Sequence, residues 1–233
     1  MEGEHLEIEL LKDKVKSEGW TKNNRKKFWS VVKEVKKLEK IDDKILNTIC
    51  ELRESHFKST HKFIFPLWVG NVVLIILIIV GMYLFYQTAF QASPIFELPI
   101  LSRVSIFIWF AIGFILIINS AHPFAHIIIG KPVGISFDGY YFDGRAKLMP
   151  TLKINYKSFL LATPKGRARM YASGALETVI LSLILAIVAS FSQIKGIVVI
   201  GWIIALLVLF TDIFLGTRFG EFAKAKNEFK EWF

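Results

Sequence analysis

Four long apolar runs alternate with charged segments along the chain. Each run has about twenty residues or more, which is enough to cross a hydrocarbon core of about 30 Å as an α-helix. The pattern predicts an all-α membrane protein with transmembrane helices at about 63–85, 104–129, 170–190 and 196–216.

The segment before the first apolar run, residues 1–62, is highly charged and has the spacing of short amphipathic helices. Thr21 is a candidate N-cap for the second of these helices, and Asp42 or Asp43 for the third. The segment is therefore predicted to be a cytoplasmic helical appendage.

Residues 130–169, between the second and third runs, have a different pattern. Two Asp-Gly pairs, which are typical of turns, lie among alternating apolar residues. Leu152, Ile154 and Tyr156 then alternate with polar residues, as in a strand that is buried on one face. We expect a small β-hairpin or sheet in this insert.

Composition and charge give the orientation of the predicted spans. The chain is 53% hydrophobic and carries a net charge of +9. Lys and Arg concentrate in residues 1–62, 130–169 and the basic tail 217–233, whereas 87–103 and 191–195 contain one each. By the positive-inside rule both termini are cytoplasmic. We assign the basic charge to contact with lipid headgroups of the bilayer and not to nucleic acid.

The remaining candidates for metal or redox chemistry outside the apolar runs are few. Cys50 is the only cysteine, so an intramolecular disulfide and a cysteine-built zinc site are both excluded. His56 and His61 fall in a polar region and are expected to be exposed histidines.

The second apolar run contains two histidines, His122 and His126, four residues apart. This spacing places both imidazoles on one face of a helix, as in helical metalloproteases that bind zinc. Ionisable side chains are rare in membrane spans and are usually functional there. The pair therefore predicts a metal site.

Further polar residues are predicted at a similar depth. Asp212 in the fourth run, Glu177 in the third and Asn71 in the first all lie, like the histidines, roughly 5–12 Å below the cytoplasmic face. His122, His126 and Asp212 together fit a zinc site with three protein ligands and one open position. A polar cluster without metal, an ion pair of Asp212 with Arg218, and a different imidazole-binding metal are alternatives.

With these residues placed, the chain resembles the site-2 protease family, the M50-type intramembrane zinc metalloproteases. His122-Pro-Phe-Ala-His126 resembles the HExxH motif of that family, and Gly174-Ala-Leu-Glu-Thr178 resembles its second motif. Asp212, in Thr211-Asp-Ile-Phe-Leu-Gly216, stands at the position of the third motif. The resemblance covers roughly residues 63–216. It implies a zinc centre and cleavage of membrane-associated proteins.

The departure from HExxH is at Pro123, where the family carries the glutamate that acts as general base. Glu177 is the candidate to replace that base, or it is a fourth metal ligand that closes the site. The sequence therefore supports two functions. One is a divergent intramembrane protease; the other is a non-catalytic pseudo-protease that binds a transmembrane or peripheral protein partner as a scaffold. A small transporter is a weaker third hypothesis, because the polar cluster lies near one face only.

Overall fold

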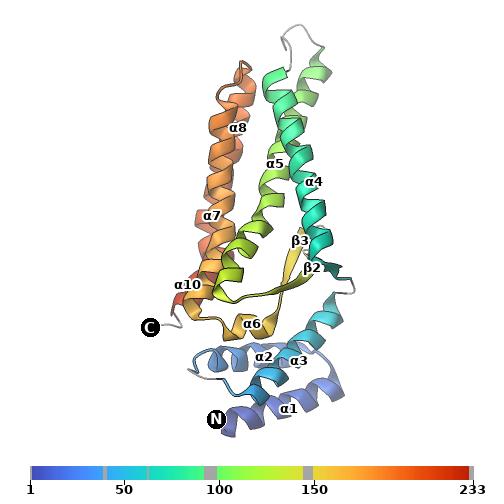
Figure 1. Cartoon of the computed structure of the whole chain (residues 1–233), viewed down its shortest axis with the longest axis vertical. Coiled ribbons are helices and arrows are strands. Elements are labelled where there is room, and N and C mark those ends of the chain that lie inside the picture. Colours follow the sequence, from blue (N-terminus) through green and yellow to red (C-terminus); the bar gives the residue numbers. More distant parts are fainter. Residues whose placement is uncertain (1, 39–40, 62, 92–98, 144–148, 231–233) are drawn as a thin grey trace. The chain divides into compact units, whose positions relative to one another are not determined.

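The structure, a computed structural model, describes residues 2–38, 41–61, 63–91, 99–143 and 149–230. The chain is mostly helical and forms two compact units (Figure 1). We call them the mixed unit, which contains helices and a sheet, and the helical unit. The mixed unit comprises Met1–Leu67, Lys131–Arg167 and Glu228–Phe233, and the helical unit comprises Trp68–Gly130 and Ala168–Asn227.

The helical unit is built on long apolar helices that run alongside one another (Figure 1). They are α4 (Leu67–Tyr86), α5 (Ile100–Gly130), α7 (Pro164–Ala189) and α8 (Lys195–Phe210). Short elements accompany them: π-helical turns η1 (Gln87–Gln91) and η4 (Thr211–Leu215), then α9 (Gly216–Phe219) and α10 (Glu221–Lys230). Four helices in the described part of the chain are long and apolar enough to cross a membrane, as predicted.

The observed helices begin earlier than two of the predicted spans. α5 begins at Ile100 and α7 at Pro164, upstream of the expected 104 and 170. At α7 the Thr163 hydroxyl accepts a hydrogen bond from the amide of Gly166 at 3.1 Å, and Pro164 occupies the first helical position. This pair is a favourable helix start, so the basic residues expected to lead into the span are themselves helical.

Two glycines allow α4 and α5 to approach closely. A Cβ placed on Gly113 would lie 2.8 Å from the carbonyl oxygen of Gly81, and one placed on Gly81 would lie 2.9 Å from that of Gly113. Next to this crossing, buried side chains of α4, α5, α7 and α8 form the core of the unit, including Phe85, Phe110, Phe114, Ala186 and Ala205. Small residues at such contacts are typical of helix packing in membranes.

We therefore expect Gly113→Ala to destabilise the helical unit. The added methyl group would meet backbone, which cannot move aside cheaply, and overpacking of this kind costs about 1–3 kcal/mol. The thermal unfolding midpoint of the detergent-solubilised protein should fall. Gly216→Ala is the control, because its Cβ would make ordinary contact with Phe222 at 3.6 Å. Equal midpoints for the two variants would contradict the close crossing.

The mixed unit combines the amino-terminal helices with the insert between the second and third spans. Its helices are α1 (Glu2–Glu18), α2 (Lys22–Val35), α3 (Asp43–Thr60) and α6 (Tyr156–Leu161). The predicted caps are confirmed: Thr21 accepts from the amide of Asn24, and Asp42 from that of Lys44. Apolar side chains from these helices form the core, including Ile8, Leu11, Phe28, Val35, Leu46 and Ile49.

The predicted β-rich insert contributes two strands to an antiparallel sheet with the strand order β1-β2-β3. The strands are β1 (Phe65–Pro66), β2 (Phe137–Asp143) and β3 (Met149–Ile154). β3 ends before the predicted Tyr156 because the Asn155 side chain accepts from the amide of Ser158 and begins α6. β1 was not predicted, since two residues are too few to show an alternating pattern.

A buried ionic cluster joins three distant segments of the mixed unit. Arg167 is 2% exposed, and its Nε donates to Glu228 Oε2 at 2.6 Å. Lys36 also forms an ion pair with Glu228. Removing one partner of such a cluster leaves an uncompensated buried charge, which is strongly destabilising. The cluster therefore fixes the end of α10 to the mixed unit.

His56 is not exposed, contrary to expectation. Its ring packs edge-on against Trp20 at 4.7 Å between centroids, and both ring nitrogens are buried without a hydrogen-bond partner among the described residues. Burial lowers the pKa of His56 below its ordinary value, and the nearby cations of Arg53 and Arg25 act in the same direction. The folded protein thus holds this imidazole neutral.

The lowered pKa of His56 predicts a loss of stability in mild acid. The unfolded chain takes up the proton first, near pH 6.5, so the contribution of His56 is intact above that pH and is lost as the pH falls toward the lower folded-state pKa. In His56→Phe, which keeps an aromatic ring beside Trp20, the unfolding midpoint should fall less between about pH 7.5 and 5.5 than in the wild type. Parallel curves would contradict the prediction.

Candidate metal centre

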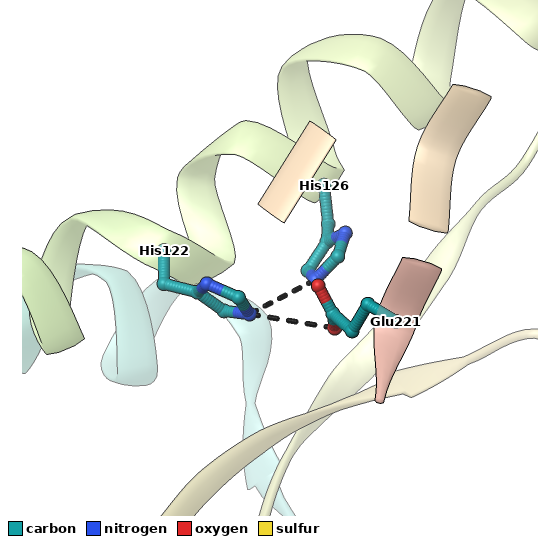
Figure 2. Close-up of side chains that lie close together, drawn as sticks. All are labelled: His122, His126 and Glu221. Atoms are coloured by element: carbon teal, nitrogen blue, oxygen red, sulfur yellow. Dashed lines mark hydrogen bonds and ion pairs between the residues drawn. The ribbon is translucent and has the colours of Figure 1, made fainter. Parts of the chain in front are cut away.

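His122 and His126 lie one turn apart on α5 and point to the same place (Figure 2). Their Nε2 atoms are 3.3 Å apart. The side chain of His126 is 11% exposed and that of His122 is 32% exposed. The spacing read from the sequence therefore produces the expected pair of converging imidazoles.

Glu221, the first residue of α10, faces the two histidines from the other side (Figure 2). Its Oε1 lies 2.9 Å from His126 Nε2 and 3.4 Å from His122 Nε2. Within the described residues, these three side chains form a group whose ligand atoms all lie within 4.8 Å of one another. Two imidazoles and a carboxylate are a possible metal-binding triad.

The outer nitrogens of both histidines are held by hydrogen bonds. His126 Nδ1 lies 2.7 Å from the carbonyl oxygen of Met170, which can only accept, so this nitrogen carries the proton. His122 Nδ1 lies 2.8 Å from Thr178 Oγ1, whose own hydroxyl proton is donated to the Gly174 carbonyl. Donation to Gly174 leaves Thr178 Oγ1 as an acceptor, which favours a proton on His122 Nδ1. Such bonds fix the tautomer of metal-binding histidines.

A consequence of these tautomers is that three acceptor atoms face one another. When both imidazoles are neutral, each presents a lone pair from Nε2, and the Glu221 carboxylate adds negative charge beside them. Acceptors at this distance repel unless a cation lies among them. Glu221 Oε2 and Glu177 Oε1 are also buried without a hydrogen-bond partner in the described part of the chain. The site therefore requires a proton or a metal ion.

Two of the three separations match a tetrahedral metal site. Ligand bonds of 2.0–2.1 Å at tetrahedral angles place ligand atoms about 3.3 Å apart. The Nε2–Nε2 and His122–Glu221 separations have this value, whereas the 2.9 Å between His126 and Glu221 is a hydrogen-bond length. A tetrahedral site would require Glu221 Oε1 to lie slightly farther from His126 Nε2. Without metal, a protonated His126 that donates to Glu221 satisfies the same contacts, as in the alternative of a polar cluster without metal.

Gly174 on α7 leaves the space in which the triad assembles. A Cβ at this position would lie 2.5 Å from His126 Nε2 and 2.5 Å from Glu221 Oε2. The stretch Gly174–Thr178, selected from the sequence as a second motif, therefore lines the site at both of its ends. Gly174 makes room for two members of the triad, and Thr178 orients the third.

The other predicted site residues lie near the triad but are not members of it. Glu177 is half-buried on α7, with Oε2 3.5 Å from Thr178 Oγ1. Asp212 lies in the π-helical turn η4, and its carboxylate is not in the group of ligand atoms described above. Both carboxylates interact electrostatically with His122. The structure thus brings the predicted histidines together with Glu221, a residue that sequence reasoning did not select.

Glu221 was missed because it follows the last apolar run and was assigned to the basic tail. The sequence feature that could have indicated a turn and a new helix at Glu221 is the pair Gly216 and Gly220 just before it. Gly220 ends α9 in an extended conformation, and a Cβ there would lie 2.7 Å from Gly216 Cα. This tight turn starts a new helix with Glu221 in its first turn.

Comparison with known proteins gives no relative from which a role for these residues can be transferred: no protein-family model, curated protein or solved structure matches the chain.

Gly174→Ala should weaken metal binding. The new methyl group would occupy the space between His126 and Glu221 and push the ligands apart. We expect a loss of tenfold or more in zinc affinity, comparable to the effect of changing residues that orient the ligands in other metal sites. The measurement is competition with a chromophoric chelator. Leu176→Ala, on the same helix and 48% exposed, is the control and should bind zinc normally.

Proposed function

We propose that the four apolar helices insert in a membrane with both chain termini in the cytoplasm. The length and hydropathy of the helices support insertion, and the distribution of Lys and Arg supports the orientation. With this topology the triad lies near the cytoplasmic ends of its helices, because His126 is four residues from the end of α5.

In this setting we propose a divergent intramembrane metalloprotease of the site-2 type, with zinc held by His122, His126 and Glu221. The observation that carries the proposal is the convergence of two imidazole nitrogens and a carboxylate oxygen, with two of their three separations at the value expected for a tetrahedral site. Two imidazoles with one carboxylate suit zinc, although other imidazole-binding ions accept the same donors. Three protein ligands leave one position for water or substrate.

The chain's own residues have distinct roles in this proposal. A zinc ion in the triad would supply Lewis-acid activation of water and of a peptide carbonyl. Glu177 would accept the proton of the attacking water and deliver it to the leaving amine, in place of the glutamate that Pro123 replaces. Its Oε1, which is buried without a hydrogen-bond partner among the described residues and interacts electrostatically with the histidines, supports this role. Thr178 and the Met170 carbonyl keep the histidines in the ligating tautomer.

A second function is favoured by Pro123 itself, which stands where a metalloprotease places its base and has no proton-accepting group. The protein would then be a pseudo-protease that retains the metal for structure. It would bind a transmembrane or peripheral protein as a scaffold, with the amino-terminal helices as a docking surface.

Glu177→Gln separates the two functions. The protein is reconstituted with zinc in proteoliposomes that contain membrane proteins extracted from cells, and new amino termini are mapped by mass spectrometry. If Glu177 is the base, Glu177→Gln should lower the cleavage rate by about 10²–10⁴-fold with unchanged zinc content. Glu34→Gln, exposed on α2, is the matched control.

Two results would contradict the protease proposal in different ways. Unchanged cleavage by Glu177→Gln removes Glu177 as the base. Absence of cleavage by the zinc-loaded wild type supports the scaffold function instead.

A further inference from the structure

α2 of the mixed unit has two opposite faces. Its buried face includes Phe28, Val31, Val32 and Val35. On the other side, Lys22, Lys26, Trp29 and Lys33 are exposed. Their spacing of four, three and four residues places them in one stripe along the helix. We call these four residues the basic stripe.

The charge around the basic stripe is strongly one-sided. Residues 20–38 contain seven Lys or Arg and one acidic residue, a net charge of +6, whereas residues 2–18 have a net charge of −3. Lys36 pairs inward with Glu228, and Lys37 pairs with Glu34. In the described part of the chain no ion pair involves the three lysines of the stripe or its neighbours Arg25 and Lys27. Their charge is therefore available to an external anion.

Trp29 lies within the stripe and is 45% exposed. Its ring is held in place by an edge contact with Phe28 at 5.1 Å and by the Arg53 guanidinium at 5.5 Å. A fixed and partly exposed indole among lysines combines an apolar surface with positive charge. Tryptophan is enriched at membrane–water interfaces for this combination of an apolar ring and a polar N–H.

The connections of the mixed unit favour a membrane as the partner. The unit is joined to the helical unit at the start of α4, the end of α5, the start of α7 and within α10. In a chain that crosses a bilayer four times, these four junctions are all on the same side. The mixed unit would therefore be tethered to one leaflet, at a high effective concentration of its headgroups.

We propose that the basic stripe binds the anionic phospholipid headgroups of that leaflet. The lysine ammonium groups would contact phosphate and carboxylate oxygens, and Trp29 would enter the headgroup layer. The interaction is mainly electrostatic, so it should weaken as salt shortens the Debye length. This inference rests on the proposed membrane insertion and is independent of the metal centre.

Lysine footprinting of the full chain tests the proposal. The protein is placed in nanodiscs of phosphatidylcholine alone or of phosphatidylcholine with phosphatidylserine, and reductive methylation of each lysine is followed by mass spectrometry. Lys22, Lys26 and Lys33 should react several-fold more slowly in the anionic discs, and high salt should remove the difference. Lys14 and Lys16, exposed on α1, are internal controls whose rates should not change.

Two double charge-reversal variants test whether the basic stripe is the surface that contacts the lipid. Lys26→Glu combined with Lys33→Glu should abolish the protection of Lys22, whereas Lys14→Glu combined with Lys16→Glu should leave it intact. Equal rates in both discs, or protection that requires added RNA or an added protein, would overturn the proposal. A chain that does not enter nanodiscs would contradict the proposed membrane insertion as well. Zinc content, measured on the same sample, tests the metal centre independently of the lipid contact.

Discussion

The close approach of His122, His126 and Glu221 is the interaction around which the centre of the helical unit is arranged. His122 Nε2, His126 Nε2 and Glu221 Oε1 come from two helices, and their separations range from 2.9 to 3.4 Å. Hydrogen bonds to Thr178 and the Met170 carbonyl direct the lone pairs of both histidines inward. Either a proton shared with Glu221 or a bound metal ion would offset this arrangement. The packing around the triad leaves room for it, above all because Gly174 has no side chain.

The sequence was sufficient for features set by local chemistry. The apolar runs located the long helices because length and hydropathy directly determine them. Thr21 and Asp42 marked helix starts because their side chains cap the amides that follow. Features that depend on tertiary packing could not be predicted from the sequence in the same way. The two-residue strand Phe65–Pro66 exists through pairing with β2, and His56 is half-buried through contact with Trp20, thirty-six residues away in the chain.

Only part of the candidate site could be predicted from the sequence, for a related reason. Two histidines four residues apart must share a helix face, so their convergence followed from helical geometry alone. The carboxylate is different, because depth along a span does not tell which side chain turns toward the histidines. Asp212 interacts electrostatically with His122, yet Glu221 is the carboxylate that contacts both histidines, because the Gly216–Gly220 turn starts a new helix beside them. Long-range placement of this kind depends on a turn outside the apolar run.

Metal content is the most direct test of this account. The wild type and the variants His126→Ala, Glu221→Gln and Asp212→Asn are purified in detergent without chelators, and zinc is measured by mass spectrometry. We predict about one zinc per chain in the wild type and in Asp212→Asn, as expected for a single site with three protein ligands, and none in His126→Ala or Glu221→Gln. Zinc retained by Glu221→Gln and lost from Asp212→Asn, or a wild type without metal, would contradict the account.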